Sequence, residues 1–299
     1  MTKQFVLDQG SLLKDQRANH IAREIIKGCF VDPADRNFAL ARFCYHSQLY
    51  TEFWWNCAQA IEKISKALLL FNGHNVKSIG HKNPAAQLYE ELADDWLKEF
   101  DPIPLGRTFR SDEKSPNEFL DHVFIFGSPD VRYASGVTPW NGNKDLFYLD
   151  QTYHFLKRYC RTLDIPVAYI GMQENGLDTT TYRQAVRKQR SVWSRADLGL
   201  LGEIMLGKKH KEMHKTLWKT NEFWKEREPR LFCELPETPV NKFTTSMGGK
   251  LDPFTYNILR KDGKAHRLSP GAKQELRQWL NTSVPMLNGL KSDVNAALS

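Results

Sequence analysis

Polar side chains of opposite charge recur at helical spacing within residues 54–72. Glu62 and Lys66 lie four residues apart, in the order that favours an ion pair along a helix. They belong to a polar stripe that consists of Asn56, Gln59, Glu62, Lys63 and Lys66, of which the last four are candidate site residues. Such a stripe could line a groove or a dimer seam, where its charged and amide groups would bind a polar partner. It is also typical of a solvated helix face, and the spacing alone does not decide between the two.

A second candidate site is the dipeptide Arg132-Tyr133, which we expect in a loop between two helices. The arginine could donate two parallel hydrogen bonds to a phosphate while the tyrosine ring stacks on a base. In a structural role, Arg132 would instead pair with a carboxylate such as Glu62 and hold the loop to the helices. His81, in the predicted loop 73–83, could likewise contact a ligand or order its own loop by a hydrogen bond.

Positive charge is concentrated in one segment. Residues 183–230 hold 13 Lys and Arg against 6 Asp and Glu, and this excess equals the net charge of +7 of the whole chain. A concentrated basic patch attracts polyanions, of which the RNA or DNA backbone is the usual one, although a solvated lysine-rich helix has the same composition. The densest cluster consists of Lys208, Lys209, Lys211 and Lys215.

The sequence predicts no metal ion and no cofactor. His210 and His214 have a spacing that can bind a metal ion, but the lysines around them disfavour another cation. The five cysteines are scattered and include no Cys-x-x-Cys motif, so neither a structural zinc site nor a disulfide framework is expected. The chain also has no phosphate-binding Gly-x(4)-Gly-Lys motif and no dinucleotide fingerprint.

The elements that must position these residues are helices. The longest predicted helix spans residues 54–72, because apolar side chains recur there every three or four residues and Gly73 follows as a stop signal. Before it, Asp32 and Pro33 predict the start of a helix over residues 34–49. Asp32 would cap the first turn, and the fixed φ of Pro33 suits the first helical position.

The same signals predict further helices and one pair of strands. The helices are expected at residues 83–100, 115–126 and 145–164, in two or three basic stretches within 179–230, and from Ser269 onwards. Asp262 and Gly263 have the residue types of a type I′ turn, so residues 254–268 are predicted to form a β-hairpin. We therefore expect a mainly α chain that consists of a helical arm (1–31), a helical bundle (32–164) and a basic, mostly helical extension (165–299).

The composition favours a folded cytoplasmic protein. Hydrophobic residues make up 41% of the 299 residues, which is enough for a sizeable core. The first residues lack the continuous apolar run of a signal peptide, and no apolar stretch is long enough to span a bilayer. We therefore expect no membrane contact.

Residues 32–164 resemble the HEPN family, named for a nucleotide-binding domain of higher eukaryotes and prokaryotes. The matching residues are Phe53-Trp54-x(4)-Gln59-Ala60-Ile61-Glu62-Lys63-x(2)-Lys66-Ala67-Leu68-Leu69-Leu70, then Asn72-Gly73 and Gly80-His81, and Arg132-Tyr133 before a final long helix. The resemblance implies an all-α, mostly up-and-down bundle, often a homodimer, that binds nucleotides or RNA. It also implies that the polar stripe, Arg132 and Tyr133 contact this ligand.

Members of the family differ in activity. Some are metal-independent endoribonucleases of toxin–antitoxin or defence systems. These carry Arg-x(4–6)-His on a helix, which would polarise the RNA 2′-hydroxyl and stabilise the phosphorane. Here only three residues separate Arg42 from His46, and Arg132 has no histidine at that distance downstream.

The resemblance therefore implies an RNA- or nucleotide-binding protein, with two alternatives. One alternative is an endoribonuclease with a divergent centre that uses Arg42 and His46, or Arg132 and His81. The other is a non-catalytic module that dimerises or docks a nucleotidyltransferase partner.

Overall fold

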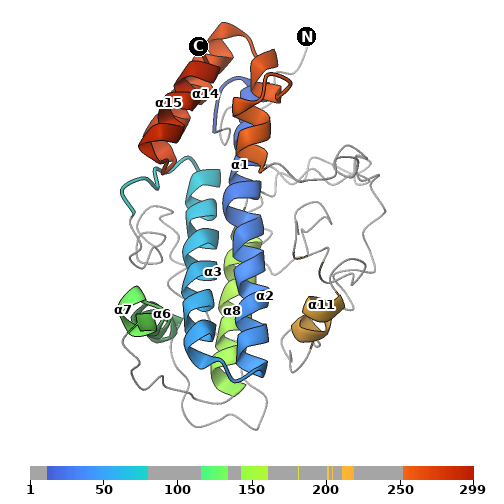
Figure 1. The fold of residues 1–299 in the computed structure, drawn as a ribbon, viewed down its shortest axis with the longest axis vertical. Helices are drawn as coiled ribbons and strands as arrows, with labels where there is room; N and C mark the ends of the chain where they lie inside the picture. The colour runs from blue at the N-terminus through green and yellow to red at the C-terminus, as the bar shows by residue number, and fades with distance from the viewer. Residues whose placement is uncertain are drawn as a thin grey trace.

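Three long helices pack side by side at the centre of the structure. The computed structural model describes residues 12–79, 116–133, 143–160, 211–218 and 252–299, together with Thr181, Leu201 and Ile204. Within these residues the chain is mainly α, as predicted, and forms no β-sheet. α2 (Asp32–His46) and α3 (Tyr50–Phe71) are antiparallel, and α8 (Asn143–Tyr159) packs against both (Figure 1).

α3 lies at the centre because apolar side chains recur along almost its whole length. Its fully buried residues include Phe53, Cys57, Ile61, Ile64 and Leu68. The helix predicted over residues 54–72 is confirmed, although it begins four residues earlier, after a turn in which Gln48 has a φ of 62°. Its end is also confirmed, because Gly73 has a φ of 83° and the N–H of His74 donates to the carbonyl of Leu69 (3.0 Å). A left-handed glycine closes a helix in this way.

α1 (Gln16–Ile26), the π turn η1 (Lys27–Val31) and α2 form one continuous helical run. The helix predicted over residues 34–49 is confirmed for most of its length by α2, but the predicted cap at Asp32 is wrong, because the helical run does not begin there. Asp32 does not cap a free end, because its own N–H donates to the carbonyl of Lys27 across the π turn. The wider turn is followed at once by Pro33, whose missing N–H would interrupt an ordinary α-helical ladder. The predicted division between the helical arm (1–31) and the helical bundle (32–164) thus lies inside a continuous helical run.

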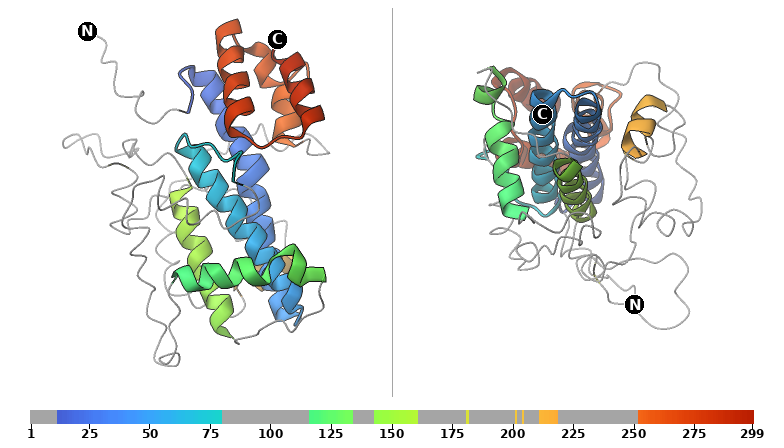
Figure 2. Two further views of the ribbon diagram at one scale, coloured as in Figure 1. Left: turned by 90° about the vertical axis from the view of Figure 1, so that its left-hand side faces the viewer. Right: turned by 90° about the horizontal axis from the view of Figure 1, so that it is seen from below.

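Shorter helices flank the bundle on opposite sides. α6 (Pro116–Phe126) and α7 (Pro129–Tyr133) contact α3, whereas α11 (Lys211–Trp218) contacts α2 (Figures 1 and 2). α6 crosses α3 instead of running along it (Figure 2). At its end, Gly127 lies so close to α3 that a Cβ would be 2.5 Å from the carbonyl oxygen of Trp54. The predicted helix 115–126 and its stop are confirmed.

Arg132 and Tyr133 lie on a short helix, so the predicted loop is wrong at this point. The hydroxyl of Ser128 accepts the N–H of Val131 (3.3 Å), which satisfies an N–H of the first turn of α7. Ser128, Pro129 and Asp130 therefore follow the end of α6 and also begin α7.

The two ends of the described chain pack together. α14 (Pro270–Ser283) and α15 (Asn288–Ala297) stand at one end of the bundle beside α1 (Figure 1). The start of α14 is confirmed, since the hydroxyl of Ser269 accepts a backbone N–H of the first turn (3.2 Å). Glu275 of α14 accepts the N–H of Asp15 (3.1 Å) at the start of α1. The sequence did not predict α15 as a separate helix.

The segment before α14 also contacts the π turn. The ring of Pro253 lies against Gly28, where an added Cβ would overlap the proline Cγ. No side chain larger than a hydrogen atom fits at residue 28 beside this ring. The glycine therefore allows the C-terminal segment to approach η1.

Residues 254–268 do not form the predicted β-hairpin. They form the π turn η4 (Thr255–Leu259) and the 3₁₀ turn η5 (Lys264–Arg267). Gly263 has a φ of −66°, whereas a type I′ turn requires a positive φ. Glycine is needed here for a different reason, because a Cβ would overlap the carbonyl oxygen of Tyr256.

Two predicted helical regions lie largely outside the described residues. These are residues 83–100 and the basic stretch 179–230, of which α11 is the main described part. Among the helices that are described, none combines the length and the apolar character needed to cross a membrane.

Candidate functional site

Two pairs of opposite charges are buried between α2 and α8. Asp35 and Arg42 lie seven residues apart on α2. Asp150 and Lys157 have the same spacing on α8. Because the two helices are antiparallel, Lys157 Nζ lies 2.7 Å from Asp35 Oδ1, and Arg42 forms an ion pair with Asp150. None of these side chains is more than 5% exposed, so both pairs are shielded from water.

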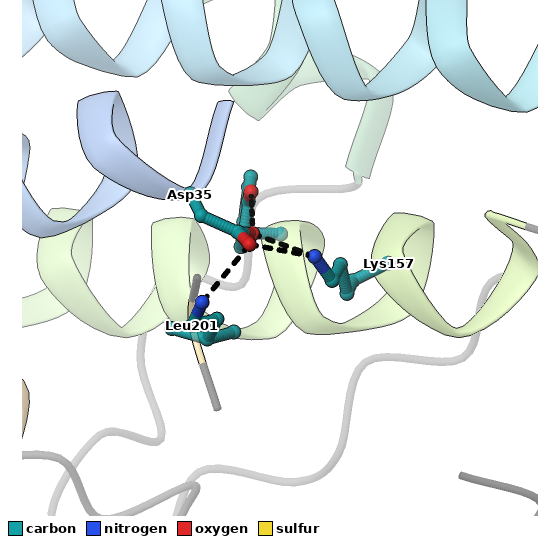
Figure 3. Close-up of polar contacts among 4 residues, drawn as sticks. Asp35, Lys157 and Leu201 are labelled. Carbon is teal, nitrogen blue, oxygen red and sulfur yellow. Dashed lines mark hydrogen bonds and ion pairs between the residues drawn. The ribbon is translucent and has the colours of Figure 1, made fainter. Parts of the chain in front are cut away.

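Asp35 accepts hydrogen bonds from three residues (Figure 3). Lys157 Nζ donates to both carboxylate oxygens (2.7 and 2.8 Å), and the hydroxyl of Tyr153 donates to Oδ1 (2.6 Å). The backbone N–H of Leu201 donates to Oδ2 (3.0 Å). Burial raises the pKa of Asp35 above its ordinary value, whereas Lys157 and the other donors lower it. The carboxylate therefore joins α2, α8 and Leu201.

Arg42 occupies the second pair. Its Nη1 donates to Asp150, and its Nε donates to the carbonyl oxygen of Thr216 in α11 (3.3 Å). Burial raises the pKa of Asp150 to about 6, although the guanidinium of Arg42 lowers it. Among the residues that the structure describes, no group donates a hydrogen bond to Asp150 Oδ1. Arg42 is 0% exposed, so it would have to leave this pair before it could touch RNA.

His46 does not share this buried environment. It is half-buried at the end of α2, with its ring edge-on to Tyr45 at a centroid distance of 5.5 Å. Arg42 lies one helical turn away, fully buried between α2 and α8. The four-residue spacing therefore places an inaccessible arginine beside a partly accessible histidine, and a catalytic role for the two together stays a prediction.

The polar stripe on α3 is not a solvated face. Glu62 and Lys66 are each only 6% exposed, and Lys66 Nζ lies 2.6 Å from Glu62 Oε1, which confirms the predicted ion pair. Lys63 Nζ donates to Asn37 Oδ1 in α2 (2.7 Å), and burial lowers the pKa of Lys63. Gln59 is half-buried. The stripe therefore ties α3 to its surroundings, and its binding of RNA or a nucleotide stays a prediction.

α11 carries the described part of the lysine cluster. Lys211 and Lys215 are exposed, and Lys215 Nζ lies 2.9 Å from Glu212 Oε1. On the other side of the helix, Leu217 is only 2% exposed. His214 Nδ1 lies 3.0 Å from the carbonyl oxygen of Ile204, so the ring contacts the backbone. α11 is thus amphipathic, with its lysines directed outward.

The remaining predicted site residues lie outside the described residues. These are His81, Lys208 and Lys209, together with the side chains of Arg132 and Tyr133. The backbone of α7 contacts α3, which also carries Glu62. A contact between Arg132 and Glu62 stays a prediction.

Four buried polar side chains that the structure brings together were not predicted as site residues. Three are charged and the fourth is a neutral tyrosine: Asp35, Asp150, Lys157 and Tyr153. One signal could have found them, because an acid and a base lie seven residues apart in both predicted helices, on the same side as apolar residues. Which acid meets which base depends on the packing of distant segments, which local spacing does not specify.

The arrangement connects helices and does not resemble a metal site. Within the described ranges, no three His, Cys, Asp or Glu side chains are grouped so that they could hold a metal ion. The four buried charges pair with one another, and two of them also bind the backbone of residues 201 and 216. No family model, no curated protein and no solved structure matches this chain.

Proposed function

We propose that this protein binds RNA and that the outward face of α11 is part of the contact surface. The supporting observation is the way in which α11 is seated on the bundle. Leu217 is buried, and the carbonyl of Thr216 accepts a hydrogen bond from Arg42. The side chain of Lys215 is 71% exposed, and Lys211, one turn away, is exposed as well. Held on one side, α11 presents its lysines to solvent on the other.

The charge distribution suits a polyanion. The basic segment 183–230 holds the whole positive excess of the chain, and α11 lies within it. Lysines that contact phosphates release condensed counterions, which gives a favourable and salt-sensitive contribution to binding. The pair between Lys215 and Glu212 is exposed, with 71% and 81% of the side chains accessible. Such a pair contributes little, so Lys215 can exchange Glu212 for a phosphate.

The resemblance of residues 53–70 to the HEPN family supports the same class of ligand. From that resemblance we further propose that the bundle is HEPN-like and acts as a homodimer in a toxin–antitoxin or defence system. Gln59, Lys63, Arg132 and Tyr133 are then further candidate contacts with RNA. A free nucleotide remains the competing ligand, because it shares the phosphate chemistry of RNA.

The test is the binding of a fluorescein-labelled, single-stranded, mixed-sequence RNA, measured by fluorescence anisotropy at low and moderate salt. The charge reversal K211E/K215E should weaken binding by about tenfold or more at low salt. It should also reduce the slope of log affinity against log salt by about 1.4, the value for two lost lysine contacts with a single strand. Unlabelled ATP serves as a competitor that reports a nucleotide site.

The matched control is K261E/R267E, which changes the net charge by the same amount on exposed residues outside the basic segment. It should bind RNA nearly as the parent chain does. Equal loss in both variants would mean that only net charge matters, and no loss in either would remove α11 from the contact surface. Displacement by ATP at concentrations close to those of RNA would favour a nucleotide site.

We do not propose cleavage by Arg42 and His46, because Arg42 is buried in its pair with Asp150. The alternative centre formed by Arg132 and His81 can be tested in the same samples. Incubation of the labelled RNA without added metal, followed by gel separation, would show fragments that disappear in R132A if that centre is active.

A further inference from the structure

Two described residues of the basic segment, Leu201 and Thr216, are attached to α2. The N–H of Leu201 donates to Asp35 Oδ2 (3.0 Å), and Arg42 Nε donates to the carbonyl of Thr216 (3.3 Å). Asp35 and Arg42 lie on one helix, about 10 Å apart along its axis at about 1.5 Å per residue. Part of the basic segment is therefore fixed along α2 and not merely in contact with it.

Both attachments are made by charged groups that are fully shielded from water. Asp35 and Arg42 are each 0% exposed. A hydrogen bond to a charged group contributes more than a bond between neutral groups, and a buried charge that loses a partner regains no water in exchange. The two bonds to the segment backbone therefore hold it more firmly than its exposed lysines could.

The guanidinium of Arg42 has a double function that another cation could not reproduce. Its Nη1 donates to Asp150 of α8, while its Nε donates to Thr216 of α11. A planar fork with several N–H groups in fixed directions can serve two acceptors at once, whereas a lysine ammonium is a compact point charge. Arg42 thus links the position of α11 to the packing of α2 on α8.

We infer that Arg42 is a positioning residue for RNA binding: it holds α11 against the bundle, so that Lys211 and Lys215 keep their outward direction, without touching RNA itself. This inference rests on the proposed function. The alternative is that Arg42 only stabilises the contact between α2 and α8. The two roles of Arg42 can be distinguished by keeping its ion pair with Asp150 and removing its bond to Thr216. Only the positioning role predicts that α11 then loosens.

Arg42→Lys makes that change. The ammonium keeps a positive charge beside Asp150 but has no Nε to donate to Thr216. In the full chain, amide hydrogen exchange of residues 211–218 should become about tenfold faster or more, while the amides of α3 stay protected. RNA affinity should fall, and the salt slope should fall by about 1.4, because two lysine contacts are lost together. Arg36→Lys, on the exposed side of the same helix, is the matched control and should change neither readout.

Unchanged exchange of residues 211–218 in R42K would overturn the inference. Faster exchange with unchanged RNA affinity would also overturn it and would count against α11 as an RNA contact, while K211E/K215E tests that contact independently. If R42K does not fold, the double variant R42M/D150N tests the same point. It replaces the ion pair by two neutral side chains, so no unpaired charge is buried, and it removes the donor to Thr216. It should speed the exchange of residues 211–218 and reduce the salt slope, and failure of either effect while α3 stays protected would overturn the inference.

Discussion

Lys157 Nζ lies 2.7 Å from Asp35 Oδ1, although 122 residues separate the two along the chain. Neither side chain is more than 5% exposed. Burial of two charges costs solvation, which their attraction offsets only when both partners are present and well hydrogen-bonded. The pair is therefore a point at which a single substitution should have a large effect.

Lys157→Met should lower the free energy of unfolding by about 3–5 kcal/mol at neutral pH, because it leaves a buried carboxylate without its cation. The loss should shrink as the pH falls, since Asp35 can then take a proton in the folded state. Adding Asp35→Asn should recover much of the loss, because a neutral amide can accept the N–H of Leu201 through its oxygen and donate through its NH₂ to the hydroxyl oxygen of Tyr153. Urea denaturation measures all three chains.

Lys144→Met is the control for this experiment, because Lys144 is a half-buried lysine at the start of the same helix. It should cost far less than K157M. Similar losses for the two substitutions would mean that any lysine on α8 contributes equally, which would contradict the role assigned to the pair.

Asp150 should make the protein's stability depend on pH in an unusual direction. In the folded state its pKa is raised from an ordinary value of 3.8 to about 6, because burial outweighs the attraction of Arg42. The folded state therefore binds this proton more tightly than the unfolded state does. The contribution of Asp150 to the free energy of unfolding should rise as the pH falls through about 6, and should be lost as the pH rises again. Its size is on the order of 3 kcal/mol.

The measurement is urea unfolding of the wild-type chain and of D150N at several pH values. The amide of this variant cannot titrate, so subtraction of its curve removes the contribution of every other group. We expect the wild-type chain to gain stability relative to D150N as the pH falls from neutral to about 4. Parallel curves would show that Asp150 does not titrate in this range in the folded state.

Gly28→Ala should lower the free energy of unfolding by about 1–3 kcal/mol, because the new Cβ would overlap the ring of Pro253. Thermal unfolding gives the comparison. The matched control is Gly271→Ala in the first turn of α14, where nothing lies within 4 Å of the new Cβ. Alanine is the better helix former, so G271A should be neutral or stabilising by up to about 1 kcal/mol. Equal effects at the two sites would contradict the contact with Pro253.

The features that could be predicted from the sequence are those set within one or two helical turns. The apolar spacing of residues 54–72, the left-handed Gly73 and the cap at Ser269 are all local, and all are confirmed. The ion pair between Glu62 and Lys66 is also local, because its members lie one turn apart.

The wrong predictions arise where one short residue pattern is compatible with two different local structures. Gly263 follows an aspartate, which predicts a tight hairpin turn, yet the position requires glycine because the carbonyl of Tyr256 lies close by. Asp32 and Pro33 predict a helix start, yet a π turn carries the helix through them. The pair between Asp35 and Lys157 could not be predicted, because it depends on how α8 is placed against α2.

The order of the buried charges on α2 and α8 also specifies the relative direction of these helices. On each helix the acid comes seven residues before the base: Asp35 before Arg42, and Asp150 before Lys157. Two helices with the same charge order can satisfy both pairs only when they run in opposite directions. If the two helices were parallel and the same four positions were in contact, Asp35 would face Asp150 and Arg42 would face Lys157. These like charges would repel each other without water to screen them. Apolar packing alone could tolerate either direction. These four charged side chains therefore select the antiparallel orientation of α2 and α8 over the parallel one.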